Sequence, residues 1–162
     1  MMMRRFLMTK LEVKQNKKLV LKQVLIKQHK NIELDKFEEK LNHFTNQLQL
    51  FKVQTFGPLV TRNAGTTIHD DGSLTTDYEL YIQAHDYKQY KHSFQIKERL
   101  EFPNCIYLKF KGKPEDLHYA HSKLDLYLYE EGLTSNGDVI TVLINEYPEQ
   151  IEVDLFRPVA SL

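Results

Sequence analysis

The chain has 162 residues, of which 41% are apolar and which include nine tyrosines and nine phenylalanines, enough to bury one compact core. Its 22 basic and 22 acidic residues balance, so it lacks the net positive charge of most nucleic-acid-binding proteins. Cys105 is the single cysteine, which excludes an intramolecular disulfide and a thiolate zinc site and favours a reducing, cytoplasmic location.

The segment 1–18 is basic and contains few apolar side chains. We expect a disordered segment or an extra edge strand here, followed by the first sheet strand over residues 19–27. Lys10 interrupts the short apolar start too early for a signal peptide. No run approaches the roughly 18 to 20 apolar residues that a membrane span needs.

A helix is predicted after this first strand. Asp35 followed by Glu38 has the spacing of a capping box, which predicts the helix start. Residues 59–68 and 75–84 are predicted strands, joined by a hairpin loop over residues 70–73 in which Gly72 supplies a positive φ. The apolar residues of the predicted helix recur at steps of three and four and therefore form one face, which we expect to pack on a sheet. They are Leu34, Phe37, Leu41, Phe44 and Leu48.

Residues 85–98 are predicted to connect this first unit to a second one. A short strand over residues 94–100 precedes Pro103, and a further strand follows over residues 104–110. Pro114 suits the first position of a second helix, and Gly132 suits its left-handed end. Two strands are predicted to complete the unit, over residues 139–147 and 151–158. One face of the helix is formed by residues at helical spacing: Leu117, His121, Leu124 and Leu128.

The two units align with each other without gaps when Gly57 is placed on Gly137. Phe37, Phe44 and Leu48 then fall on leucines of the second helix. This gapless alignment of the helices and of the turns that follow them indicates an internal duplication.

We therefore predict an α+β fold of two pseudo-symmetric strand–helix–strand–strand repeats. Repeat one covers about residues 19–84, repeat two covers about 99–159, and both belong to a single domain over 19–162. The repeats are expected to form an antiparallel sheet with both helices on one face and a ligand cleft on the other.

Several segments of repeat two resemble the GyrI-like (gyrase-inhibitor-like) family, which also supplies the effector-binding domain of multidrug-responsive transcription activators. The resemblance lies in RLEFP at 99–103, IYLKFKG at 106–112, and IEVDLFRPV at 151–159, which ends in the Pro-Val typical of the family. It covers about residues 19–159 by layout and 99–159 by sequence, and it points to a stand-alone Gram-positive bacterial branch.

The resemblance implies a cleft between the repeats, lined by aromatic residues and an acidic residue that meets cationic or apolar ligands. We therefore predict a non-enzymatic module that binds a small molecule without a cofactor. Two alternatives stay open: a protein-interaction domain, linked to a secretion or toxin system or forming a homodimer, and a small-molecule hydrolase that uses a cleft carboxylate. Regulators of the family carry a DNA-binding segment before this domain, whereas the short segment 1–18 precedes the first predicted strand here, so direct nucleic-acid binding is not expected.

Polar residues on the predicted cleft side are the candidate ligand-binding residues. In the last strand Glu152 and Asp154 alternate with apolar residues, so both carboxylates share one face. A carboxylate among tyrosines suits a cation, and if desolvated it suits general acid–base chemistry. An ordinary solvated sheet face explains the same pattern. The candidates are Glu152, Asp154, Glu146, Tyr81, Tyr107 and Tyr147.

His118 and His121 lie one helical turn apart on the second predicted helix. A zinc site needs three or four protein ligands, and no third ligand stands at a suitable spacing. We therefore expect neither a metal site nor a catalytic residue that could be named from the sequence.

Overall fold

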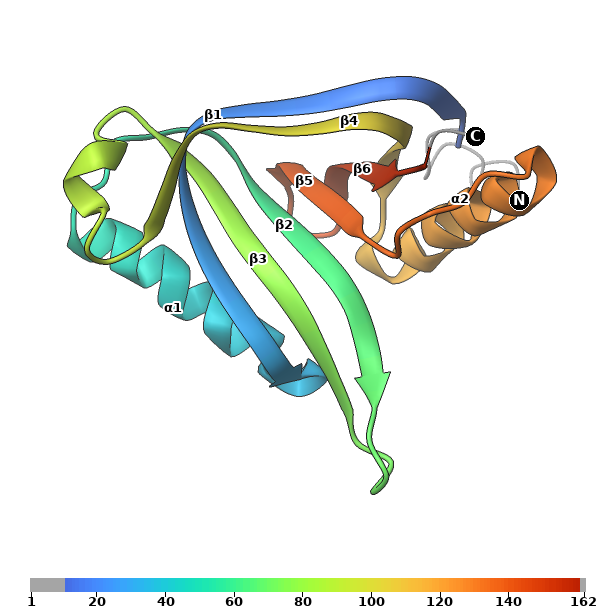
Figure 1. The fold of residues 1–162 in the computed structure, drawn as a ribbon, viewed down its shortest axis with the longest axis horizontal. Coiled ribbons are helices and arrows are strands. Elements are labelled where there is room, and N and C mark those ends of the chain that lie inside the picture. The colour runs from blue at the N-terminus through green and yellow to red at the C-terminus, as the bar shows by residue number, and fades with distance from the viewer. Residues whose placement is uncertain (1–10, 161–162) are drawn as a thin grey trace. The chain divides into compact units, whose positions relative to one another are not determined.

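The computed structural model describes residues 11–160. Within that range the chain forms two α-helices and six β-strands and divides into two compact units. The amino-terminal unit comprises Val20–Leu100, and the carboxy-terminal unit comprises, of the described residues, 11–19 and 101–160. Strands β1 (Val13–Glu33) and β4 (Gln95–Gly112) each contribute to both units. Figure 1 follows the order of the elements by colour.

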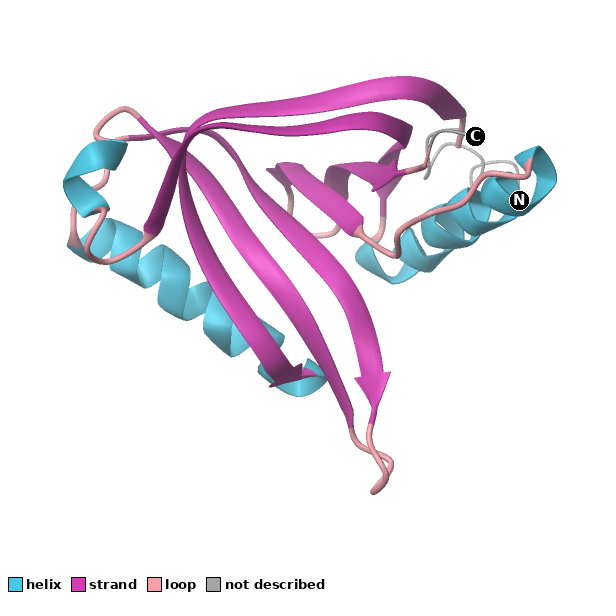
Figure 2. Ribbon diagram, in the orientation of Figure 1, coloured by secondary structure: helices cyan, strands magenta, loops and turns pink. Residues whose placement is uncertain are grey.

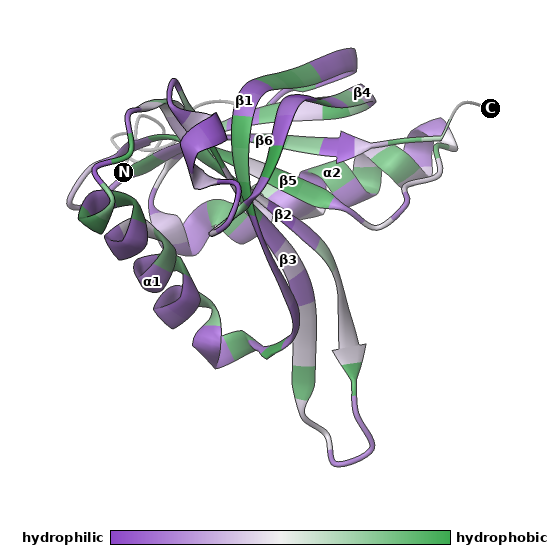
Figure 3. Cartoon of the chain, turned by 60° about the vertical axis from the view of Figure 1, so that its left-hand side comes forward, coloured by the Kyte–Doolittle hydropathy of each residue, from purple (hydrophilic) through white to green (hydrophobic). Residues whose placement is uncertain are grey.

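In the amino-terminal unit, β3 (Leu74–Ala84) pairs in antiparallel fashion with β1 on one side and with β2 (Thr55–Ile68) on the other. Helix α1 (Phe37–Leu50) connects β1 to β2 and packs on one sheet face. Apolar and polar residues alternate around this helix (Figure 3), as an amphipathic helix on a sheet requires. The buried core between α1 and the strands contains Leu25, Phe44, Leu48, Tyr78, Leu80, Ile82, Ala84, Tyr87 and Phe94.

The carboxy-terminal unit repeats this arrangement. Strand β6 (Ile151–Pro158) pairs with β4 on one side and with β5 (Val139–Glu146) on the other, again antiparallel. Helix α2 (Leu117–Glu131) connects β4 to β5. The predicted α+β class and the strand–helix–strand–strand repeats are thereby confirmed, each with its helix on one sheet face. The buried core contains Ile106, Leu108, Phe110, Ala120, Leu124, Val153 and Leu155.

The pseudo-symmetry extends to details of the backbone. Each helix follows a 3₁₀ turn, Leu34–Lys36 or Pro114–Asp116, and the gapless alignment of the repeats places one turn on the other. Gln23 in β1 and Asn104 in β4 adopt the left-handed conformation, with φ of 54° and 57°. Asn16 and Asn31 of β1 are left-handed as well. Gln23 and Asn104 match by strand register, because the residues that follow them, Val24 and Cys105, pair with Gln83 and Pro158 of the middle strands.

Two local predictions were wrong. Asp35 does not cap α1: it lies inside the 3₁₀ turn, and the residue before the helix, Lys36, makes no side-chain capping bond. Pro103 does not separate two strands, because β4 runs through it without a break, as Figure 2 shows. Asn104, next to it, adopts the left-handed conformation. Its side-chain amide donates a hydrogen bond to the carbonyl oxygen of Val159, and its backbone carbonyl accepts one from the Val159 N–H.

Other boundaries agree closely with the prediction. Pro114 occupies the start of the turn before α2, and Gly132 ends that helix with φ of 65°. Of the predicted basic segment, residues 13–18 form the start of β1, and residues 1–10 lie outside the described range. Within residues 11–160, no helix combines the length and the apolar character needed to cross a membrane. The single domain predicted over residues 19–162, with its cleft, stays a prediction.

Candidate functional site

Two of the predicted ligand-binding residues contact each other in the carboxy-terminal unit. The hydroxyl of Tyr107 in β4 donates a 2.7 Å hydrogen bond to Oδ1 of Asp154 in β6. Burial, followed by the neighbouring Asp154 carboxylate, raises the pKa of Tyr107, so this hydroxyl stays protonated as a donor. The ring of Phe156 lies 5.0 Å from that of Tyr107, which places an aromatic pair beside the carboxylate.

Glu152, the second predicted carboxylate, has different partners. Asn145 donates a 3.1 Å hydrogen bond to Oε1, and the Lys109 ammonium lies 3.0 Å from Oε2. The hydrogen bond from Asn145, together with that from Lys109, holds the pKa of Glu152 below its ordinary value. A general acid needs the opposite shift, because it must carry its proton near neutral pH. Glu152 is therefore an ionised structural partner of Lys109.

Glu146 and Tyr147 lie at the far end of the same unit. Both are exposed, and the backbone of Tyr147 forms the turn to Gln150 between β5 and β6. Of the surface of Tyr147, 44% is exposed to solvent. Neither residue shares a hydrogen bond with the Tyr107–Asp154 pair, so their predicted role in ligand binding stays a prediction.

Tyr81 lies in the amino-terminal unit and is almost completely buried. Its hydroxyl donates a 2.6 Å hydrogen bond to Oε1 of Glu79, and Nη1 of Arg62 lies 2.6 Å from the same oxygen. The side-chain amide of Gln28 donates to the other carboxylate oxygen at 2.9 Å. Burial, followed by the hydrogen bond to Glu79, raises the pKa of Tyr81.

Glu79 and Asp154 hold equivalent places in the two repeats. Tyr81 is paired with Ile26 and Val60, and Phe156 is paired in the same way with Tyr107 and Ile140. Glu79 precedes Tyr81 by two residues on the middle strand of its unit, and Asp154 precedes Phe156 by two residues on the middle strand of the other. Each carboxylate accepts a hydrogen bond from a tyrosine hydroxyl. The residues facing α1 or α2 alternate with these, so both pairs lie on the helix-free face of their sheet.

Glu79 was not predicted as a site residue, although alternation along its strand places it on the same face as Tyr81. The gapless alignment holds for the helices, but on the third strands it places Glu79 on Val159, beyond Asp154. Aligning β3 and β6 separately would have paired Glu79 with Asp154.

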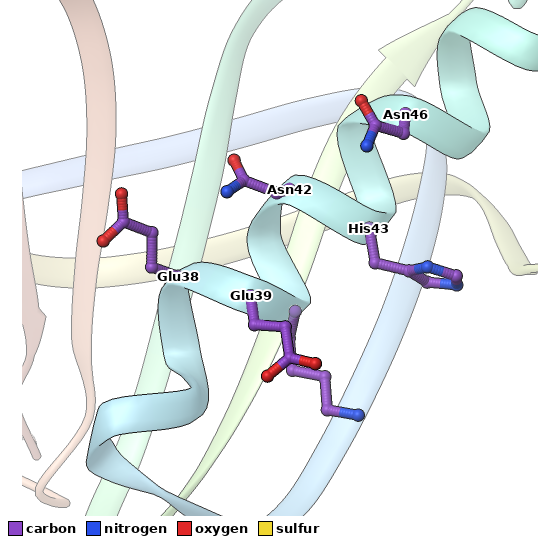
Figure 4. A pocket seen from close by; sticks show the side chains of 6 residues that line it. Glu38, Glu39, Asn42, His43 and Asn46 are labelled. Atoms are coloured by element: carbon purple, nitrogen blue, oxygen red, sulfur yellow. The ribbon is translucent and has the colours of Figure 1, made fainter.

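A wide surface hollow of about 640 Å³ lies on α1, and all its lining residues in the described chain belong to that one helix. Figure 4 shows these polar side chains spreading apart, Glu38 and Asn42 among them, as on a solvated helix face. Within residues 11–160, no group of three histidine, cysteine, aspartate or glutamate residues could hold a metal ion.

No protein-family model matches this chain, and no curated protein sequence matches it. Among solved structures, the EcmrR C-terminal domain superposes with a TM-score of 0.64 at 10% identity, covering 94% of this chain and 98% of that domain. EcmrR in a complex with DNA gives the same TM-score, and the match covers 60% of its chain. A hydrolase encoded by lin2189 from Listeria innocua gives a TM-score of 0.52 at 14% identity, covering 93% and 92% of the two chains. These similarities establish a shared fold.

Proposed function

We propose that this chain is a non-enzymatic module that binds a small cationic molecule with an apolar body, and that Asp154 recognises the cation. The observation that carries the proposal is the Tyr107–Asp154 pair, a carboxylate beside two aromatic rings on the helix-free face of β6. Lys109 forms its ion pair with Glu152. It also lies directly across from Asp154, whose hydrogen bond comes from an uncharged hydroxyl. A bound cation would gain Coulomb attraction from Asp154 and cation–π attraction from Tyr107 and Phe156.

The repetition of the motif supports this proposal. A partly buried carboxylate costs free energy, because it loses hydration. Each repeat nevertheless carries one at the same register position, Glu79 or Asp154, with a tyrosine hydroxyl bonded to it. Glu79 differs in one respect, since Arg62 already supplies it with a cation. Asp154 is therefore the better candidate for an external cation.

The solved neighbours support binding of a small molecule. The EcmrR domain comes from a protein that was solved with DNA, and the resemblance of repeat two to effector-binding domains suggests ligand recognition by this fold. The match spans that domain and not the rest of the EcmrR chain, so contact with DNA is not part of the proposal. We propose a cytoplasmic location, which the single cysteine suggests, in a bacterium, which the resemblance suggests.

A protein-interaction role is the second candidate, and one observation favours it. Helix α2 exposes three large side chains, Tyr119, Leu126 and Tyr129, of which Tyr129 retains 85% of its surface. Exposed apolar side chains gathered on one helix often mark a contact surface. The hydrolase alternative has less support: a neighbour is titled a hydrolase, but the lowered pKa of Glu152 removes that residue as a general acid.

A shape-matched pair of ligands tests the proposal. Phenyltrimethylammonium and tert-butylbenzene have nearly the same shape and differ in charge. We expect the cation to raise the melting temperature of the wild-type protein, because a ligand that binds the native state stabilises it. The shift should disappear in Asp154→Asn and persist in Glu152→Gln. A shift of equal size with tert-butylbenzene, or in Asp154→Asn, would refute Asp154 as the cation site.

A further inference from the structure

The outer face of α2 carries large apolar side chains where a surface helix normally carries polar ones. Tyr119, Leu126 and Tyr129 are 53%, 54% and 85% exposed. They are separated by seven and three residues, so they lie on one face of the helix. Together with the exposed Ser122 between them they form the outer stripe of α2. The opposite face, which includes the buried Leu124, is the one that packs on the sheet.

Helix α1 provides an internal comparison, because the gapless alignment of the repeats equates its positions with those of α2. At the positions of the outer stripe, α1 carries only exposed polar residues: Glu39, Asn42, Asn46 and Gln49. Figure 4 shows the first three of them directed away from one another. The fold of a repeat therefore does not require an apolar outer face on its helix. Exposed apolar side chains that gather on one surface mark a contact with another molecule.

The outer stripe is symmetric about its own midpoint. Its four residues are separated by three, four and three positions, a spacing that reads the same in both directions along the helix. When two copies pair antiparallel about a two-fold axis, Tyr119 of each copy faces Tyr129 of the other. Leu126 likewise faces Ser122, whose small side chain leaves room for it. A two-fold interface needs this self-complementarity, because the same patch meets itself.

The charges beside the outer stripe complement each other in the same arrangement. Lys123 and Glu130 are exposed along one side of it, seven residues apart. Helical side chains lean toward the amino terminus of their own helix. In an antiparallel pair, Lys123 therefore leans toward Glu130 of the other copy, and that Glu130 leans toward Lys123. The two Lys123 side chains lean apart, so opposite charges are brought together twice.

We propose that two copies of this chain associate through the outer stripes of their α2 helices, packed antiparallel across a two-fold axis. The proposal names the partner and the surface for the protein-interaction role, and it does not rest on the cation site at Asp154. The stripe contributes fewer residues than the roughly 20 to 30 a side of a standard interface. The dimer is therefore weak, with a dissociation constant on the order of tens of micromolar.

Sedimentation equilibrium of the full-length protein tests the association, at concentrations from about tenfold below to about tenfold above that dissociation constant. We expect the average mass to rise from that of a monomer toward that of a dimer. Asp154→Asn should behave like the wild type, so a failure of this proposal and a failure of the cation site are told apart. A mass that stays at the monomer value throughout would overturn the proposal in favour of a different partner for this face.

Leu126→Asn gives α2 the residue that α1 carries at the equivalent position. A substitution acts twice in a two-fold interface, so we expect association to weaken by at least about tenfold. Leu50→Asn is the matched control, because Leu50 is 78% exposed on α1, and it should associate like the wild type. Both leucines are exposed, so both variants should fold. Unchanged association in Leu126→Asn, or an equal loss in Leu50→Asn, would refute a contact through the outer stripe.

A charge exchange separates a contact between copies from an effect within one copy. Lys123→Glu and Glu130→Lys should each weaken self-association, because each substitution turns the two opposite-charge contacts into like-charge contacts. A one-to-one mixture of the two variants should restore association, since each charge then meets its opposite in the other copy. A mixture that associates no better than either variant alone would overturn the proposed antiparallel arrangement.

Discussion

Glu79 and Asp154 occupy the same register position in the two repeats, and each accepts a hydrogen bond from a tyrosine hydroxyl. The two tyrosines come from different strands: Tyr81 lies on β3 together with Glu79, whereas Tyr107 reaches Asp154 from the neighbouring β4. Both repeats thus form a hydrogen bond between a tyrosine hydroxyl and a carboxylate, although the tyrosine lies on a different strand in each. That convergence suggests a requirement for the pair itself, beyond what the packing of either strand needs.

The Tyr107–Asp154 bond should contribute measurably to stability. In Tyr107→Phe the carboxylate loses a donor that is partly shielded from water, and bonds to charged groups typically contribute about 1.5–3 kcal/mol. We expect the free energy of unfolding to fall by roughly 1–2 kcal/mol, measured by urea denaturation. Tyr129→Phe should change it by less than about 0.5 kcal/mol, because that ring is exposed. Equal effects of the two substitutions would mean that Tyr107 contributes no specific hydrogen bond.

The ionisation of Glu152 can be measured separately. The hydrogen bond from Asn145 is the largest cause of its lowered pKa, followed by that from Lys109. We therefore expect ¹³C NMR titration to find the pKa below its ordinary value. Asn145→Ala should raise it more than Lys109→Met does. A pKa above the ordinary value in the wild type would revive Glu152 as a general acid and with it the hydrolase alternative.

Core packing in the carboxy-terminal unit depends on one face of α2. Leu124 is fully buried and aligns with Phe44 of α1 in the gapless alignment of the repeats, whereas Leu126 on the same helix is 54% exposed. Leu124→Ala should reduce the free energy of unfolding by about 2–5 kcal/mol through lost burial and the cavity left behind. Leu126→Ala should change it by less than about 0.5 kcal/mol. Urea denaturation of both variants checks the assignment of the two faces, which similar losses would contradict.

Tyr78→Phe should not lower the free energy of unfolding, in contrast to Leu124→Ala. The hydroxyl of Tyr78 has no protein partner within residues 11–160 and sits in a buried site, where burial raises its pKa to about 12. Removing an unpaired buried hydroxyl takes away a desolvation cost. We expect the unfolding midpoint in urea to stay the same or to rise. A loss of more than about 1 kcal/mol would show that the hydroxyl already has a partner of comparable strength.

Much of the fold could be predicted from the sequence, because it depends on local periodicity. The stripes that include Phe44 and Leu124 identify both helices, and alternation in β3 and β6 identifies their buried faces. The 3₁₀ turn before α1 could not be predicted in this way, because a capping-box spacing is compatible with a helix that starts at Asp35 or later. The continuity of β4 through Pro103 could not be predicted either, because a proline cannot donate to a ladder and usually marks the end of a strand.

The candidate site was predicted only in part. Asp154 and Tyr107 were expected to share a sheet face, but their hydrogen bond depends on the register between β4 and β6. Glu79 was missed because the hairpin of repeat one is longer: more of the chain separates the paired residues Val60 and Tyr81 than separates Ile140 from Phe156. Because the two hairpins differ in length, a gapless alignment of the repeats does not place Glu79 on Asp154, although the two residues hold equivalent places in their sheets.

Two histidines should make stability depend on pH. Burial is the largest cause that lowers the pKa of His29 and of His121, and the charges of Lys40 and Arg157 add to it. In the unfolded chain both titrate near about 6.5. Between the folded and the unfolded pKa the unfolded chain binds more protons, so the free energy of unfolding must fall as pH drops below about 6.5.

We expect urea denaturation to show full stability above about pH 7 and a progressive loss as the pH falls below about 6.5. His29→Gln and His121→Gln should each reduce that slope, because each removes one group that protonates on unfolding. His92→Gln is the matched control, since His92 is exposed, and it should leave the slope unchanged. Glu152 titrates in a lower window, because its pKa is lowered from the ordinary value of a glutamate. A wild-type stability that is flat from pH 7 to 5, or that rises on acidification, would show that neither histidine is held neutral by the fold.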